Sequence, residues 1–190
     1  ILFILCCATT NISAQHSYNL NNTPHLKVYQ DSLLRISNDI YNATNNEDQS
    51  FANAKFIKTL VAALKTPSSF NFPFDSLKRI SILKSPDNSF RIFSWQLPLS
   101  DGTYRFFGSV QIATKDGKLK MFPLIDGTSN IKDINEITDH KNWYGARYYD
   151  IIPVKGNGKQ PFYVLLGWKG NNAKSSKKVI EILSFDKLNQ

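Results

Sequence analysis

The sequence DNSFRIF at residues 87–93 returns as DGTYRFF at residues 101–107 and as DGKLKMF at residues 116–122. Each copy opens on Asp-Asn or Asp-Gly, which are tight-turn signals because these residues tolerate positive φ. Each copy then alternates apolar and polar side chains, with the period of two that is typical of a β-strand. The three copies therefore predict a β-meander of antiparallel hairpins.

The basic residue of each copy, namely Arg91, Arg105 and Lys120, falls opposite the apolar side chains. We expect these residues on a solvated outer face, as in an antiparallel sheet with one wet side. A repeat of this kind also suggests a propeller or another array, but three copies are too few to close a propeller. We favour an ordinary meander that reuses one kind of turn. Further strands are predicted at residues 77–83, 146–154, 161–168 and 177–184.

Upstream of the meander, apolar residues recur with the period of an α-helix. Thr23 and Pro24 predict the N-cap and the first turn of one helix, and Pro67 ends a second one. We expect an antiparallel helical hairpin that packs on the sheet, with a coiled-coil partner as the alternative. The predicted apolar stripes are Leu26, Tyr29, Leu33, Ile36 and Ile40 in the first helix and Phe56, Ile57, Leu60, Val61 and Leu64 in the second.

The predicted fold class is therefore α+β, an N-terminal helical hairpin packed on a mainly antiparallel β-meander that forms a sandwich or a partial barrel. The chain has 190 residues, of which 42% are hydrophobic, and this is enough apolar material for one compact domain. We place this single domain at residues 24–190. Because a predicted strand reaches almost to Gln190, we expect the domain to be truncated at its C-terminus.

The N-terminus has the pattern of a secretory signal peptide that has lost its basic start. Residues 1–7 read ILFILCC, and small and polar residues lead to a predicted cleavage site after Ala14. The apolar run is much shorter than the about 20 residues that span a bilayer, and a buried N-terminal strand is the alternative. We expect residues 1–14 to be a signal remnant and residues 15–23 to be a flexible leader.

Several chemistries lack their usual residues in this sequence. The two cysteines, Cys6 and Cys7, are adjacent, which excludes a disulfide scaffold and a cysteine-based zinc site. The three histidines form no cluster with metal-ligand spacing. The Gly-x-Ser-x-Gly elbow, the Walker loop and the dinucleotide-binding glycine pattern do not occur. We therefore predict no metal and no cofactor.

The formal net charge of the chain is +8, and most of it lies in the C-terminal part. Residues 155–190 contain seven lysines against Glu181 and Asp186, a balance of +5. Such a surface attracts phosphates, anionic glycans or a membrane weakly, but exposed lysines also protect edge strands and keep a protein soluble. We favour the second explanation. No nucleic-acid partner is predicted, because no recognition helix or ribonucleoprotein motif accompanies the charge.

The segment 133–149 gathers the side chains best suited to chemistry. Its carboxylates and histidine suit general acid–base catalysis, and its aromatic rings suit stacking on sugars. The alternative interpretation, which we favour, is a surface loop that leads into a half-buried strand, because aromatic residues are ordinary strand formers. The candidate catalytic residues are Asp133, Glu136, Asp139 and His140, and the candidate ligand-binding residues are Trp143, Tyr144, Arg147, Tyr149 and Trp168.

Several phrases are distinctive as a set: TPSSF at 66–70, SPDNSFRIFSW at 85–95, NWYGA at 142–146, Tyr148-Tyr149, and LLGW at 165–168. Together they resemble a group of exported proteins of Bacteroidetes-type bacteria to which no activity is assigned. The resemblance covers roughly residues 56–185. It implies export and a chain that continues into more β-structure, and it carries no catalytic residue and no ligand.

These observations predict an exported protein that is periplasmic, on the outer surface or extracellular, with no transmembrane helix in the mature chain. We expect a non-enzymatic binding or structural role, with a glycan, a peptide or an envelope component as the partner. The alternative is a hydrolase that acts on an envelope or extracellular polymer through the 133–149 loop.

Overall fold

The computed structural model describes residues 22–155 and 162–186, so the predicted signal remnant, most of the leader and the last four residues lie outside the described part. Two helices are followed by a short 3-10 helix and seven strands, all paired antiparallel, in two sheets of order β1-β2-β3-β4 and β5-β6-β7. This confirms the α+β prediction. The elements are α1 (Thr23–Asn42), α2 (Asn46–Leu64), η2 (Ser69–Asn71), β1 (Ser81–Lys84), β2 (Phe90–Pro98), β3 (Tyr104–Ile112), β4 (Lys120–Ile125), β5 (Arg147–Val154), β6 (Phe162–Asn172) and β7 (Ser175–Ser184).

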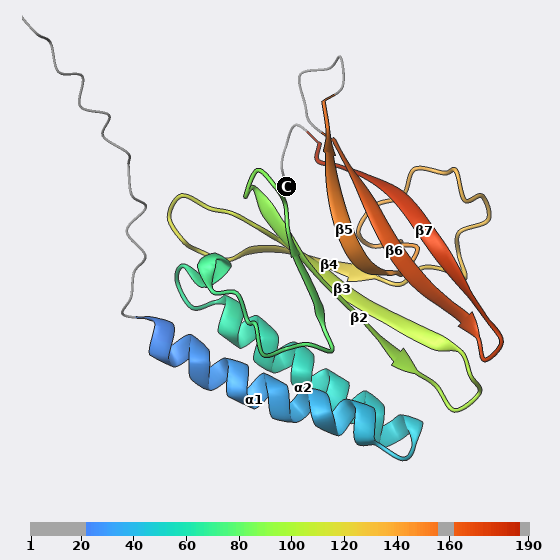
Figure 1. Ribbon diagram of the computed structural model, residues 1–190, viewed down its shortest axis with the longest axis horizontal. Helices are drawn as coiled ribbons and strands as arrows, with labels where there is room; N and C mark the ends of the chain where they lie inside the picture. Colours follow the sequence, from blue (N-terminus) through green and yellow to red (C-terminus); the bar gives the residue numbers. More distant parts are fainter. Residues whose placement is uncertain (1–21, 156–161, 187–190) are drawn as a thin grey trace, which may run out of the picture.

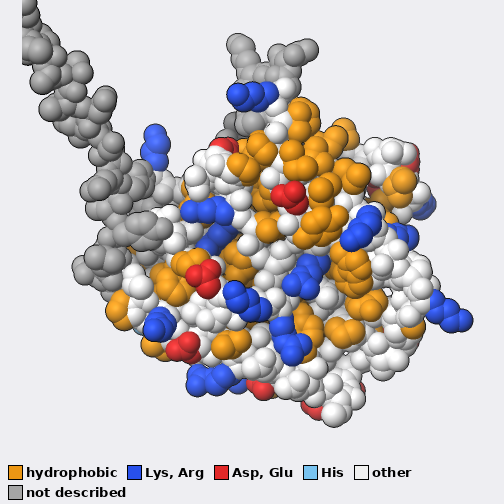
Figure 2. All heavy atoms as spheres, viewed as in Figure 1, with side chains coloured by type: hydrophobic (Ala, Val, Ile, Leu, Met, Phe, Trp, Pro, Cys, Tyr) orange, Lys and Arg blue, Asp and Glu red, His pale blue; other side chains and the backbone are white. Residues whose placement is uncertain are grey.

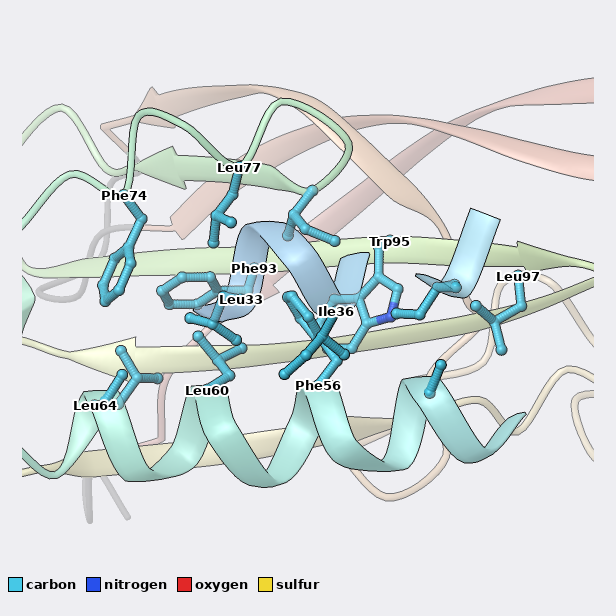
Figure 3. Packing of buried hydrophobic residues seen from close by; sticks show 14 of the residues in the cluster. Leu33, Ile36, Phe56, Leu60, Leu64, Phe74, Leu77, Phe93, Trp95 and Leu97 are labelled. Atoms are coloured by element: carbon cyan, nitrogen blue, oxygen red, sulfur yellow. The ribbon is translucent and has the colours of Figure 1, made fainter. Parts of the chain in front are cut away.

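The four-stranded sheet is the middle layer of three (Figure 1). The helical pair covers one of its faces, where most members of the two predicted stripes, such as Leu33 and Phe56, are buried against β2 (Figure 3). Tyr29, Ile57 and Val61 of the stripes are half-buried. Trp95 Nε1 also donates a hydrogen bond to Asn53 Oδ1 of α2 at 2.8 Å. The stripes thus pack on the sheet, as expected, and not on a coiled-coil partner.

Helix α1 starts one residue earlier than predicted. The N-cap position belongs to Asn22, and Thr23 is the first helical residue, with Pro24 in the first turn. The Asn22 side chain makes no capping bond, and its amide instead donates to Pro67 O at 3.2 Å, beyond the end of α2. A contact between the start of α1 and the segment after α2 has therefore replaced the expected local cap.

The three repeats form the three hairpin turns that the sequence predicts. In each turn the aspartate Oδ1 accepts a hydrogen bond from the backbone N–H two residues later, which is the geometry of an Asx turn. The residue after each aspartate has positive φ, which Gly and Asn tolerate. The three Oδ1 to N distances are 3.2 Å at Asp87, 2.9 Å at Asp101 and 3.1 Å at Asp116, and the φ values are 58° at Asn88, 80° at Gly102 and 71° at Gly117.

The prediction of a solvated outer face is wrong for the middle of the four-stranded sheet. Strand β2 is buried along almost its whole length, because the second sheet covers the face that the helices leave open. Phe90 and Ile92 of β2 pack there with Tyr163 and Leu165 of β6. The two sheets thus form the sandwich that was one of the two predicted shapes.

Arg91 was predicted to lie on the solvated outer face, and this prediction is also wrong, because the residue is buried. Its guanidinium lies on the helix side and donates to Gln111 Oε1 at 2.8 Å, to Phe72 O at 2.6 Å and to Ser69 O at 2.9 Å. Burial lowers the pKa of Arg91 to about 9. The residue ties the segment after α2 to the sheet, whereas Arg105, at the same place in the next repeat, is exposed.

Candidate functional site

The predicted catalytic carboxylates lie on the exposed connection between β4 and β5. Asp133, Glu136 and Asp139 are exposed. Asp133 Oδ1 accepts a hydrogen bond from Asn135 N at 2.9 Å, and Asp139 Oδ1 accepts one from Lys141 N at 2.8 Å. Both aspartates thus shape turns of their own loop.

His140 is fastened to strand β4 and not to the carboxylates. Its Nδ1 lies 2.9 Å from Pro123 O, so this nitrogen carries the donated proton, and its ring lies 5.5 Å from that of Phe122. Within residues 22–155 and 162–186, no side-chain hydrogen bond or ion pair joins His140, Asp133, Glu136 and Asp139 to one another. In the same ranges, no group of three or more His, Cys, Asp or Glu side chains has the arrangement of a metal site.

Trp143 belongs to a buried polar network between the two sheets. Its Nε1 donates to the Tyr148 hydroxyl at 2.6 Å, and this hydroxyl donates to Glu181 Oε2. Burial raises the pKa of Glu181, and it raises the pKa of Tyr148 well above the usual value. The network holds β7 to β5, and Trp143 has no polar atom left for a ligand.

Tyr144 takes part in a second internal network, centred on Lys169 of β6. The Lys169 ammonium donates to Thr128 Oγ1 at 2.8 Å, to Gly145 O at 2.7 Å and to Tyr144 O, and it lies 4.4 Å from the centre of the Tyr144 ring. Burial lowers the pKa of Lys169, an effect that the nearby Asp126 carboxylate opposes. Because all three ammonium protons have acceptors, Lys169 fixes the 126–145 connection to β6.

The second sheet exposes its other face, and that face is apolar. Cross-strand pairing places Ile152, Val164 and Ile182 in one row, Val154, Phe162 and Ser184 in the row on one side, and Asp150, Leu166 and Ile180 in the row on the other. The alternate residues of the same strands, such as Ile151 and Leu165, are buried against the first sheet. We call this surface the outer apolar face; its members are Ile152, Val154, Phe162, Val164, Leu166, Ile180 and Ile182.

The outer apolar face is open to solvent. Ile152, Ile180 and Ile182 are 41%, 75% and 72% exposed, and the other members are half-buried. Figure 2 shows these side chains as a hydrophobic area over β5, β6 and β7. Contiguous exposed apolar areas are often functional surfaces, in contrast to single exposed hydrophobic residues, which are ordinary.

Three of the predicted ligand-binding residues border the outer apolar face at one end. Arg147 and Lys178 are the cross-strand partners of Trp168, one row beyond Leu166 and Ile180. Tyr149 is 50% exposed at a β-bulge of β5, with Lys178 Nζ 5.1 Å from its ring. Trp168 also packs edge-on against Tyr104 of the first sheet, with ring centres 5.3 Å apart.

The isoleucines and valines of this face were not among the predicted site residues. A signal was present, because FYVLLGW at residues 162–168 is apolar at almost every position. Such continuous runs are typical of strands with both faces covered, whereas alternation is typical of strands with one wet face. The sequence of β6 therefore indicates a second covering layer, which the described part of the chain does not supply.

A second surface feature is a shallow groove of about 710 Å³ between α1 and α2. Side chains of both charges line it, including Arg35, Asp39 and Lys55. None of the buried side-chain atoms that lack a hydrogen-bond partner in the described residues points into this groove. It therefore offers less recognition chemistry than the outer apolar face.

No family model, no curated protein and no solved structure matches this chain. Among the described residues, no helix is both long enough and apolar enough to cross a membrane. Function therefore has to follow from the surfaces of the chain itself.

Proposed function

We propose that this chain is an exported, non-enzymatic binding protein and that the outer apolar face is its binding surface. The observation that carries the proposal is the exposure of Ile180 and Ile182, which are 75% and 72% exposed in neighbouring rows of one sheet face. Complete burial of one such side chain is worth about 1.5–3 kcal/mol. A partner that covers the face recovers most of this free energy.

Two sequence features support export. The apolar run at residues 1–7 is followed by a small-residue stretch that ends at Ala14, which is the order of a signal peptide. The resemblance of residues 56–185 to exported bacterial proteins agrees with it. We propose a location in the periplasm, on the outer surface or outside the cell, with an envelope component as the partner.

The chemistry of the face favours an apolar partner over a glycan. Sugars bind on flat aromatic rings, but the central rows are Ile, Val and Leu, with Phe162 as the aromatic member. Hydrolysis through the 133–149 loop receives less support, because glycosidase chemistry needs a positioned carboxyl pair that flanks the scissile bond. Asp133 and Asp139 instead accept backbone hydrogen bonds in separate turns.

The proposal is tested by sedimentation of purified protein with washed bacterial envelopes. The variant is Ile180→Thr/Ile182→Thr, which keeps the β-branched shape that suits a strand. The control is Ile134→Thr/Ile137→Thr, at two isoleucines that are 81% and 101% exposed on the β4–β5 connection. We expect the wild type and the control to sediment and the face variant to stay in solution. Equal sedimentation of all three proteins, or of none, would contradict the proposal.

A further inference from the structure

Building on the proposed function, we propose that the partner of the outer apolar face is the surface of an anionic lipid bilayer. In this arrangement the rows of Ile, Val and Leu enter the boundary between headgroups and acyl chains. The cations at the two ends of the face, Arg147 and Lys178 at one and Lys155 at the other, contact the headgroups.

The composition of the face favours lipid over a protein partner. Protein hot spots are enriched in Trp, Tyr and Arg, and Leu and Val are under-represented in them. The centre of this face is aliphatic, and its most exposed members are Ile180 and Ile182. Acyl chains are fluid and accept such side chains without a matching shape, whereas a protein interface needs complementary packing.

The border of the face has the residue types of a membrane interface. Tyr149 and Trp168 combine an apolar ring with a polar atom, and such rings concentrate at headgroup depth. Lys178 lies beside Tyr149, with its Nζ 5.1 Å from the ring centre. Its long aliphatic stem can follow the apolar surface while the ammonium reaches the headgroups.

The charges around the face are complementary to an anionic surface. Among the described residues around the face, Arg147, Lys155 and Lys178 carry three positive charges. Two exposed carboxylates oppose them: Asp150, the cross-strand partner of Leu166, and Asp186, two residues beyond the end of β7. The Asp150 carboxylate is occupied by the backbone of its own strand, since Oδ1 accepts from Ile151 N at 2.8 Å. Each Lys or Arg close to an anionic membrane strengthens binding about fivefold.

The same charges and the small size of the face disfavour a second copy of this chain. Three strands about 4.8 Å apart and three rows about 6.8 Å apart span roughly 10 by 14 Å between Cα atoms, or on the order of 300 Å² with side chains. A stable protein interface buries about 800 Å² on each partner. Two copies packed face to face would also bring Arg147, Lys155 and Lys178 near those of the other copy, which is repulsive.

The test is co-sedimentation of purified protein with vesicles of phosphatidylcholine, with and without phosphatidylglycerol. We expect binding to the vesicles that contain phosphatidylglycerol and at least tenfold weaker binding to phosphatidylcholine alone. Ile180→Thr/Ile182→Thr should weaken binding about tenfold, and the control Ile134→Thr/Ile137→Thr should not change it. Lys178→Gln should weaken binding about fivefold, whereas Lys118→Gln, at a lysine on the β3–β4 turn that is 82% exposed, should leave it unchanged.

Three outcomes overturn the lipid proposal. Envelope sedimentation that depends on Ile180 and Ile182, combined with no vesicle binding, assigns the face to a protein partner and leaves the proposed function intact. Vesicle binding that is equal in the wild type and in Ile180→Thr/Ile182→Thr indicates adsorption by charge alone. A concentration-dependent dimer in analytical ultracentrifugation that Ile180→Thr/Ile182→Thr abolishes assigns the face to a second copy.

Discussion

Replacing Arg91 by methionine tests the contact that fastens the segment after α2 to the sheet. Arg91 is 2% exposed, and its guanidinium donates to Gln111 Oε1, Phe72 O and Ser69 O at 2.8, 2.6 and 2.9 Å. Methionine reproduces the aliphatic stem but donates no hydrogen bond. The substitution therefore removes three hydrogen bonds and leaves Gln111 Oε1 and Phe72 O without their donor, whereas Ser69 O keeps the hydrogen bond from Phe72 N at 2.9 Å.

The expected loss of stability follows from these three contacts. A buried polar group without a partner costs about 1–3 kcal/mol. One gain offsets part of this, because the variant no longer buries a guanidinium, whose pKa burial lowers to about 9. We expect a net loss of about 3 kcal/mol. A domain of this size loses about 2–4 °C in Tm for each kcal/mol, so Tm should fall by about 6–12 °C.

The sequence provides a matched control for this prediction. Arg105 occupies the same position in the next repeat but is exposed, so Arg105→Met should change the free energy of unfolding by no more than about 0.5 kcal/mol. Urea unfolding followed by circular dichroism, together with thermal melts, measures both variants. Equal unfolding midpoints for Arg91→Met and Arg105→Met would refute the inference that the buried hydrogen bonds hold this segment.

Three further predictions concern titratable groups. Partial burial opposes the ionised form of Asp87, but hydrogen bonds from Tyr163, Ser85 and Ser89 outweigh it and lower the pKa of Asp87 to about 2. This carboxylate therefore stabilises the fold above pH 3.8, and the contribution is lost as pH falls through about 2; Tyr163→Phe should destabilise the protein at pH 7 but much less at pH 2 in urea titrations. Burial raises the pKa of Glu181 above 4.5, so its ionisation costs stability as pH rises, and Glu181→Gln should gain stability relative to the wild type between pH 4 and pH 7. A constant difference between these two proteins across that range would contradict the assignment. Alanine at Asp133, Glu136, Asp139 or His140, one at a time, should leave envelope sedimentation unchanged, and loss of any polymer-degrading activity in one of them would support the hydrolase alternative.

Local signals predicted most of the elements correctly. The apolar stripe of α1 needed only the helical period, and its members Leu26, Leu33 and Ile40 are buried. The turns at Asp101 and Asp116 needed only the Asp-Gly pair, because the side chain and the glycine φ together define the turn. Signals of this kind act within a few residues, which is why one sequence is enough to find them.

Non-local contacts explain what the sequence did not reveal. Arg91 and Arg105 both lie between two apolar residues of their repeats, yet only the first is covered, because residues 69–72 fold back over β2 and supply carbonyl acceptors. Lys169 is 6% exposed although it follows Trp168 in a strand whose other residues give no hint of a polar interior. Its acceptors, such as Gly145 O, lie on a connection whose path no local pattern fixes.

Strand β7 shows how the buried networks and the outer apolar face depend on each other. In a strand with one covered face, apolar side chains normally point inward and charged side chains outward. Here Glu181 points inward, while Ile180 and Ile182 point outward. A shift of one residue in the pairing would exchange the two sets, placing both isoleucines in the core and the carboxylate in solvent. The hydrogen bond from the Tyr148 hydroxyl to Glu181 Oε2, together with the buried Val179, opposes that shift. A polar contact in the core thus fixes which hydrophobic side chains face outward, and a surface held in place in this way is suited to a partner that covers it.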